Sequence, residues 1–341
     1  MDNRQAAVTS RQTILDVFSG KDISTQPPFS GLIHITAEGL QSEGLVFHEV
    51  HKDARKMARA SASTFKLSGI PSAVAPLDMM VEAEAIGSAI DFRENGEIAF
   101  PRTVKPLFPS TKFVTAEIGE SFDLLNRGRV RLVCEALELL KEDIGQNAVI
   151  GGMIPGPFTL LLYLIEPGGL FAEMKREPNA VQDALFHLAS FLARVAQVYR
   201  NAGADFITIH DMGGSPGFIG PAKYEQFAFP AEELLITQLP PPRVLSVCGN
   251  TNKSIHLLAQ TGADAIAVDQ LNDLSASRPM LNNTLLFGNI DPVAALWQGD
   301  QAQIEEAVRA AKAAGVDAVW PGCDLVLQTA AENLKALVTA S

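Results

Sequence analysis

Eight short, largely apolar segments recur along this chain, with longer segments of helical periodicity between them. The apolar segments lie at 29–34, 72–76, 148–153, 205–209, 243–248, 265–269, 284–288 and 317–320. Because apolar residues follow one another instead of alternating with polar ones, the pattern is typical of parallel strands that are buried on both faces. Eight parallel strands, each followed by a helix, make a (β/α)8 barrel. We therefore predict the α/β class and a barrel of this kind.

The segments between these strands predict helices that end at glycine. The helical segments lie at 51–67, 129–143, 178–199, 223–239, 254–261, 301–314 and 330–339. Gly203, Gly262 and Gly315 each stand at such an end, before a small residue and an acid. Glycine past a helix end adopts the positive φ that turns the chain into the next element. The recurrence indicates repeated αβ units.

One segment, 87–115, interrupts the alternation after the second predicted strand. Strand-like triplets occur within it at 90–92, 98–100 and 112–114. They surround Asn95-Gly96, a dipeptide that favours a β-hairpin turn. We expect residues 1–341 to form a single barrel domain with this hairpin as an inserted excursion, which explains why the chain exceeds the roughly 250 residues of a typical barrel.

Charge and cysteine content limit the partners and the compartment. Lys plus Arg number 27 against 39 Asp plus Glu, and this net charge of −12 argues against nucleic acid or an anionic membrane as partner. The most apolar stretch, 158–165, is too short to cross a bilayer, and the N-terminus lacks the pattern of a secretion signal. Three scattered cysteines do not make a disulfide framework. We expect a soluble, cytoplasmic protein.

Polar residues follow the predicted strands at the end where parallel barrels carry their chemistry. They include His34, Asp78, Glu82, Glu84, His210, Asp211, Cys248, Asn250, Asp269, Asn289, Asp291, Cys323 and Asp324. Cys248 and Cys323 follow the fifth and eighth predicted strands, so we interpret the two together as part of a site. Cys134 falls within a predicted helix and is expected to pack there.

Each of these positions also has a purely structural interpretation. Asp211 can be a hydrogen-bonded strand end, Asp269 can cap the segment that follows it, and 289–292 can begin a helix at its proline. Glu82 and Glu84 can lie on a solvated loop. The apolar residues beside them favour partial desolvation instead, which raises a carboxyl pKa and suits proton transfer.

Five motifs in the same order give the chain a family likeness. They are Glu-Ala-Glu-Ala-Ile-Gly at 82–87, the segment 150–159, Val-Cys-Gly-Asn-Thr at 247–251, Gly-Asn-Ile-Asp-Pro at 288–292 and Pro-Gly-Cys-Asp at 321–324. With them the chain resembles the uroporphyrinogen decarboxylase superfamily. Within that superfamily it is most similar to the corrinoid-dependent methyltransferases typified by methylcobalamin:coenzyme M methyltransferase. The likeness covers most of the chain, 11–337.

The resemblance implies a barrel that moves a methyl group between a corrinoid and a small acceptor. The corrinoid would be carried on a partner protein or be free methylcobalamin. In the coenzyme M branch a His-x-Cys pair and a distant cysteine hold zinc, which binds the acceptor thiol as thiolate. The matching positions here are Ser246, Cys248 and Cys323, so the histidine is missing. Either His210, Asp211 or a glutamate completes the site, or the metal is lost and tetrahydrofolate replaces the thiol as acceptor.

The strand-end positions and the resemblance together give each candidate an expected role. The expected metal ligands are Cys248 and Cys323. For acceptor orientation and proton transfer we expect Asp211, Asp269, Asn289 and Glu84. For substrate binding we expect Glu82, His210, Asn250 and Asp291. The oligomeric state stays open, a homodimer included.

Two other functions stay open at this point. Decarboxylases of the superfamily resemble one another in an N-terminal Met-Arg-Gln-Ala-Gly-Arg stretch, whose arginines pair with substrate carboxylates. This chain has no arginine between Arg11 and Arg55, so a uroporphyrinogen decarboxylase is the weaker alternative. The third candidate is a non-catalytic corrinoid-binding barrel that kept the fold after losing its metal.

Overall fold

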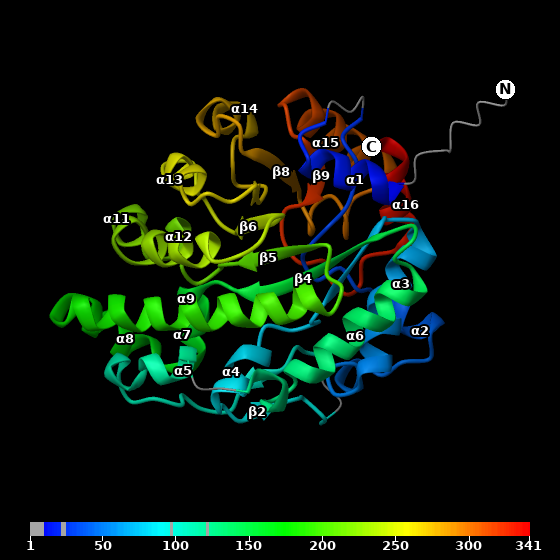
Figure 1. The fold of residues 1–341 in the computed structure, drawn as a ribbon. Coiled ribbons are helices and arrows are strands. Elements are labelled where there is room, and N and C mark those ends of the chain that lie inside the picture. The colour runs from blue at the N-terminus through cyan, green and yellow to red at the C-terminus, as the bar shows by residue number, and fades with distance from the viewer. Residues whose placement is uncertain (1–9, 22–24, 96–97, 121–122) are drawn as a thin grey trace, which may run out of the picture.

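The centre of the molecule is a curled, parallel, seven-stranded sheet in the order β1-β4-β5-β6-β7-β8-β9 (Figure 1). The strands are β1 (Ser72–Ala75), β4 (Val149–Pro155), β5 (Phe206–His210), β6 (Arg243–Val247), β7 (Ala265–Val268), β8 (Leu285–Ile290) and β9 (Ala318–Pro321). This computed structural model describes residues 10–21, 25–95, 98–120 and 123–341. All seven strands lie on predicted segments and begin and end within two residues of the predicted bounds.

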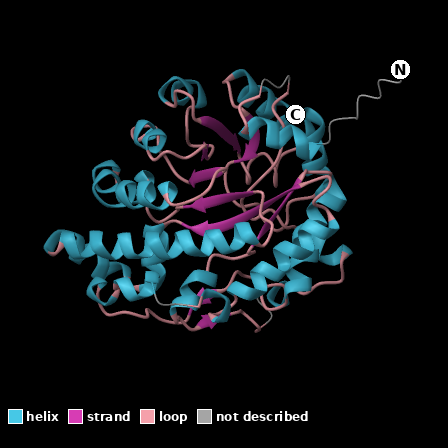
Figure 2. Ribbon diagram, in the orientation of Figure 1, coloured by secondary structure: helices cyan, strands magenta, loops and turns pink. Residues whose placement is uncertain are grey.

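Helices cover the outside of this sheet (Figure 2). The α-helices of the described residues are α1 (Ser10–Phe18), α2 (Ala37–Ser42), α3 (Ala54–Ser68), α4 (Val81–Ile86), α5 (Ala116–Glu120), α6 (Val130–Asp143), α7 (Pro157–Leu164), α8 (Pro167–Arg176), α9 (Pro178–Asn201), α10 (Pro216–Ile219), α11 (Pro221–Lys223), α12 (Phe229–Thr237), α13 (Ile255–Gln260), α14 (Leu274–Ser277), α15 (Gln301–Ala313) and α16 (Ala331–Ala340). The predicted glycine ends are confirmed, because Gly203, Gly262 and Gly315 have φ values of 107°, 81° and 88°.

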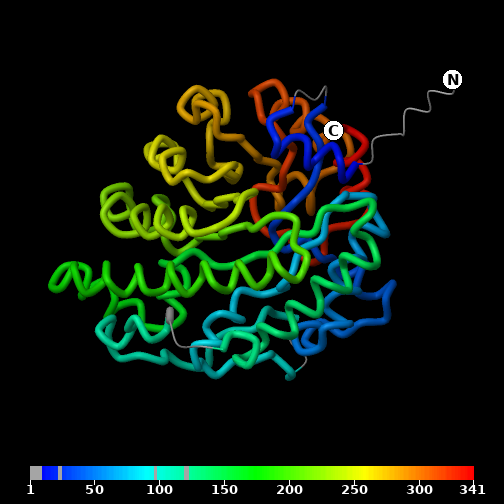
Figure 3. Tube along the Cα trace, in the orientation of Figure 1, coloured from blue at the N-terminus to red at the C-terminus, as the bar shows by residue number. Residues whose placement is uncertain are grey.

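The prediction of a strand at 29–34 is wrong. An isolated bridge joins Pro28 to Val319 of β9, and the Ser30 N–H donates to the Ser72 hydroxyl of β1. This irregular segment therefore lies between the two edge strands, at the eighth position of the barrel, and the tube in Figure 3 shows the N-terminal segment beside the C-terminal one. Neighbouring prolines 27 and 28 have no N–H to donate, so a regular ladder does not form there.

The predicted helix at 223–239 is interrupted for a similar reason. It begins as α11, continues as a π-helix over Tyr224–Ala228 and becomes α-helical only in α12. Pro230 is the second residue of α12. Its ring crowds the carbonyl four residues earlier and it supplies no N–H, which favours the wider turn ahead of it.

Within the inserted segment, the short strand β2 (Ile90–Asp91) pairs antiparallel with β3 (Arg102–Thr103), at the bottom of Figure 2. Gly96 of the predicted turn lies outside the described residues. The predicted strand at 98–100 is irregular, and 112–114 is wrong as well, because Thr111–Phe113 forms a 3-10 helix. The Ser110 hydroxyl and the Glu173 carboxylate accept its first N–H groups, which removes them from any ladder.

Aromatic side chains close the amino end of the barrel. The Phe29 ring lies 4.8 Å from Trp320 and 5.3 Å from Phe287, and Phe18 of α1 lies 5.5 Å from Phe206. A buried aromatic cluster of this size fills the space between the strand starts. The carboxyl end is therefore the open end. No helix in the described ranges combines the length and the apolar character needed to cross a bilayer.

Candidate metal centre

One imidazole and two thiols converge at the carboxyl end of the sheet. His210 is the last residue of β5, Cys248 directly follows β6, and Cys323 lies two residues beyond β9. The sulfur atoms of the two cysteines are 2.8 Å apart, and the Cys248 sulfur is 4.0 Å from His210 Nε2. All three donor atoms lie within 4.8 Å of one another. The structure thus places the two predicted cysteines together and adds His210 to them.

The imidazole of this group comes from β5, whereas the family pattern places a histidine at position 246 on β6. Parallel pairing puts His210 directly opposite Ser246. The Ser246 hydroxyl lies 3.4 Å from His210 Nδ1, which leaves Nε2 facing Cys248. A partner on one ring nitrogen sets which nitrogen can bind a metal. Of the residues considered for completing the site, His210 is the one that reaches the sulfurs.

The three donors suit zinc. A tetrahedral zinc with bonds of about 2.3 Å to sulfur and about 2.0 Å to nitrogen separates its ligand atoms by roughly 3.5–3.8 Å, and the observed separations bracket that range. The hydrogen bond between the two thiols lowers the pKa of Cys323 and raises that of Cys248, because the pair shares one proton. One thiolate is therefore already favoured, and three protein ligands leave a fourth position for an acceptor.

Asp211 follows His210 in the sequence, but its carboxylate hydrogen-bonds with the loop after β5 and with Thr159. One of its carboxylate oxygens accepts from the N–H and hydroxyl of Thr159 and from the Gly214 N–H. The other oxygen is buried beside the Glu232 carboxyl, with which Asp211 interacts, and burial raises the pKa of Asp211. A Cβ on Gly156 would clash with the same carboxyl group, so glycine is required there. These contacts agree with the structural interpretation of Asp211.

Asp269 and Asn289 connect the loops beside Cys248. The Asp269 carboxylate accepts from the N–H groups of Gly249 and Leu271. The Asn289 amide donates to the carbonyls of Asp269 and Asn272, at 3.1 and 2.9 Å. These two residues therefore hold the loops after β6 and β7 and the end of β8 together beside the site.

The hydrogen bonds of Asn250 and Asp291 go to residues other than the three candidate metal ligands. The Asn250 side chain is exposed and accepts from Asn252, while Asp291 accepts from the N–H groups of Val293 and Ala294. Asp291 thus caps a turn and not the helix that its following proline suggested. Within the described residues, neither side chain hydrogen-bonds with the three donors.

Glu84 belongs to a second cluster, after β1. Arg129, the residue directly before α6, donates to Glu84 and forms a two-bond ion pair with Asp78, at 2.7 and 3.0 Å. His51 Nδ1 also lies 2.8 Å from Asp78. Burial disfavours the charge of Asp78, but Arg129 and His51 outweigh it and hold the pKa of Asp78 well below its usual range. Glu84 is thus the partner of a buried arginine and has no contact with the sulfurs in the described structure.

Glu82 is fully buried beside this cluster. One of its carboxylate oxygens accepts from the Tyr199 hydroxyl at 3.1 Å, and the other has no partner. Burial raises the pKa of Glu82 to about 8. The carboxyl is therefore protonated at neutral pH, as a proton-handling group would be.

Replacing Glu82 with glutamine should change how stability depends on pH. The folded-state pKa of about 8 lies above the usual glutamate value of 4.5, so Glu82 makes the wild-type protein less stable as the pH rises from 4.5 towards 8. We expect Glu82→Gln to flatten this decline. At pH 9 its free energy of unfolding should exceed that of the wild-type protein by on the order of 2 kcal/mol. Urea unfolding at pH 5, 7 and 9 measures the free energy of unfolding, with the exposed Glu142→Gln as control. An unfolding free energy that depends on pH in the same way in the wild-type protein and in Glu82→Gln would contradict the raised pKa of Glu82.

The sequence analysis missed the half-buried hydroxyl of Tyr163 and gave no role to Asp324, which acts on it. Burial and four carboxylates, among them Asp78 and Asp211, raise the pKa of Tyr163 on α7. Asp324 also acts on Tyr163 and accepts from the Ile33 N–H; burial raises its pKa to about 6. Tyr163 stands within an apolar helix, where nothing in the sequence marks it, whereas Asp324 was visible as a strand-end acid.

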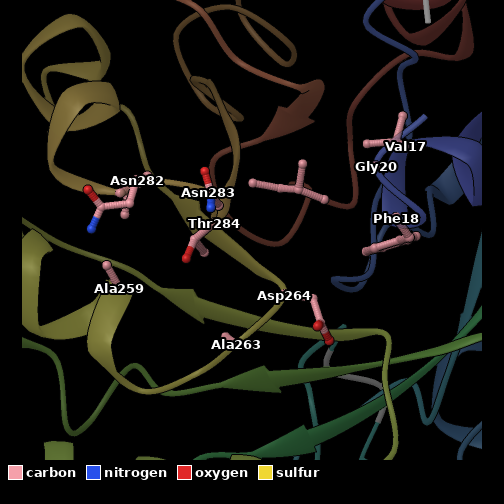
Figure 4. A pocket seen from close by; sticks show the side chains of 11 residues that line it. Val17, Phe18, Gly20, Ala259, Ala263, Asp264, Asn282, Asn283 and Thr284 are labelled. Atoms are coloured by element: carbon pink, nitrogen blue, oxygen red, sulfur yellow. The ribbon is translucent and has the colours of Figure 1, made fainter. Parts of the chain in front are cut away.

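A pocket at the other end of the barrel is unrelated to this centre. Figure 4 shows Asp264, Asn282 and Thr284 around it, near the amino ends of β7 and β8. Barrel chemistry belongs at the opposite ends of these strands. The candidate site therefore remains the group at His210, Cys248 and Cys323.

A model of the uroporphyrinogen decarboxylase family matches residues 9–341. The chain belongs to that family. Among curated relatives, a methylcobamide:CoM methyltransferase of Methanosarcina acetivorans is 31% identical over 309 residues, covering 89% of this chain and 88% of its own length. A uroporphyrinogen decarboxylase of Thermodesulfovibrio yellowstonii is 27% identical over 292 residues and covers 82% of each chain.

The solved structure of a methyltransferase from Methanosarcina mazei superposes with a TM-score of 0.91 at 25% identity, covering 97% of this chain and 98% of that one. The predicted family and the predicted α/β barrel are confirmed. The relatives also confirm that this family member is an enzyme of the methyltransferase type.

Proposed function

We propose that this methyltransferase moves a methyl group between a methylated corrinoid on a partner protein and a small thiol, at a zinc held by His210, Cys248 and Cys323. The observation that carries the proposal is the convergence of these three donors at the open end of the barrel. The relatives are named methylcobamide:CoM methyltransferases, which supports the choice of a corrinoid as donor. Zinc bound there would supply a Lewis acid that lowers the pKa of an acceptor thiol.

The chain's own residues hold and orient this group. Ser246 fixes the ring of His210, while Asp269 and Asn289 hold the loops that position Cys248. In the transfer, the acceptor releases its S–H proton and forms an S–CH3 bond, while the Co–CH3 bond breaks and leaves its electron pair on cobalt. Holding acceptor sulfur and methyl carbon in line, away from water, is what the barrel contributes to the rate.

The complete donor set favours a thiol over tetrahydrofolate. A nitrogen acceptor needs a proton-handling group and no metal, whereas two thiolates and an imidazole are the ligands that zinc prefers. Decarboxylation of a porphyrinogen is less well supported, because Arg129, the buried arginine after β1, is already paired with Asp78 and Glu84.

The test is a metal analysis beside a demethylation assay. Purified protein is expected to hold one zinc per chain and to demethylate methylcobalamin only when a thiol is present. Cys134→Ser is the matched control, since Cys134 is buried in α6 away from the centre. Zinc-free protein that methylates tetrahydrofolate would refute the thiol, and coproporphyrinogen formed from uroporphyrinogen would refute methyl transfer.

A further inference from the structure

The two cysteines of the candidate metal centre form a pair that reaches across the open end of the barrel. Cys248 follows β6 and Cys323 follows β9, and in the sheet β7 and β8 lie between these two strands. Their sulfur atoms are nevertheless only 2.8 Å apart, and all three cysteines of the chain are free thiols. The third, Cys134, is buried in α6. The pair at the centre is therefore placed to join its two loops through a disulfide.

Contacts of neighbouring residues hold each cysteine of this pair in place. The Ser215 hydroxyl donates to the Cys248 carbonyl. The N–H of Gly322, the residue before Cys323, donates to the carbonyl of the last residue of β8 at 2.8 Å. A Cβ on Gly322 would come within 2.9 Å of the Asp269 backbone, so the loop after β9 packs closely on the loop after β7. Two groups held side by side in this way react with each other as if at high concentration.

Both sulfurs can be reached from solvent. The side chains of Cys248 and Cys323 are partly exposed, whereas His210 is fully buried. The acceptor proposed above is a small thiol, RSH, and the oxidised form of such a thiol is a small disulfide, RSSR. A cysteine that exchanges with RSSR first forms a mixed disulfide, and a second cysteine beside it displaces the bound thiol. Any RSSR that enters the mouth therefore meets a cysteine with its resolving partner next to it.

We propose that Cys248 and Cys323 form a redox switch that inactivates the enzyme when the acceptor thiol is oxidised. The step is a thiol–disulfide exchange. RSSR takes up two electrons and becomes two RS−, while the two zinc-bound thiolates lose two electrons and form the bond between Cys248 and Cys323, and the chain releases Zn²⁺. Metal and disulfide exclude each other, because a metal needs the cysteines as thiolates. Excess RSH and zinc reverse the exchange. The inference rests on the proposed function, because it concerns the regulation of that same site.

Equilibration at fixed thiol-to-disulfide ratios tests the switch. The zinc-loaded full chain is incubated without oxygen in mixtures of 2-mercaptoethanol and 2-hydroxyethyl disulfide. Free thiols are counted by alkylation after denaturation, and the zinc that stays on the chain is measured after gel filtration. We expect two thiols, one zinc and the demethylation activity to be lost together, and peptide mapping to join Cys248 to Cys323. Because zinc is a product, an about tenfold higher free zinc concentration should require an about tenfold higher ratio [RSSR]/[RSH]² for half conversion.

Two variants make the test specific. Cys134→Ser is the matched control and should convert at the wild-type ratio. His210→Ala keeps both sulfurs but binds zinc less tightly, so half conversion should need a ratio lower by about a hundredfold, the factor by which its zinc affinity falls. Mixed disulfides on single cysteines without the link, or a link that forms while zinc stays bound, would overturn the inference. A chain that forms the link but holds no zinc when fully reduced would instead refute the proposed function.

Discussion

His210→Ala should lower the affinity of the protein for zinc by about a hundredfold or more. Removing a residue that only supports a metal ligand costs roughly 10–100-fold, and loss of a ligand itself should reach at least the upper end of that range. The remaining donors would be two cysteines, fewer than the three protein ligands that zinc enzymes use. Competition with a chromophoric chelator measures the affinity, and thiol-dependent demethylation should fall in parallel.

A second substitution should restore the metal. Ser246 lies opposite His210 on the neighbouring strand. The double variant His210→Ala/Ser246→His would therefore place a new imidazole near the two sulfurs. We expect this double variant to recover most of the lost zinc affinity. The exposed His256→Ala is the matched control and should bind zinc like the wild-type protein. Full zinc affinity in His210→Ala would contradict the assignment of the ligand.

The sequence predicted all seven strands of the central sheet and the barrel, because both depend on periodicity, which each segment carries by itself. It failed at 29–34, where composition resembles a strand but the two prolines before it remove the ladder donors. It failed at 112–114 for a related reason, since Ser110 and Glu173 take the N–H groups that a strand would need. Side-chain competition of this kind depends on tertiary contacts.

The site was predicted in part. Both cysteines follow strands and meet as expected, because residues after parallel strands share one end of a barrel. His210 was expected to bind substrate or to complete the metal site, and its approach to Cys248 depends on the pairing of β5 with β6, which no sequence pattern states. Asp211 and Asp269 accept from backbone N–H groups of the loops that follow their strands, and these contacts depend on the folded chain.

Arg129→Met should destabilise the fold by about 3–5 kcal/mol, because it leaves the buried Asp78 carboxylate without its two-bond partner. Glu84 and the His51 carbonyl would lose a donor at the same time. Urea unfolding followed by circular dichroism measures the change. Arg131→Met, an exposed change two residues farther along in α6, should cost less than about 1 kcal/mol.

A double variant separates the charge from the packing of this arginine. Arg129→Met/Asp78→Asn removes the uncompensated negative charge, so it should recover a substantial part of the stability lost in Arg129→Met. If the double variant were no more stable than the single one, the loss would come from the packing of the guanidinium on Phe92, 4.8 Å from its ring centre, and the ion pair would contribute little. Zinc binding should survive in both variants as long as they fold, because Arg129 has no bond to the three donors in the described structure.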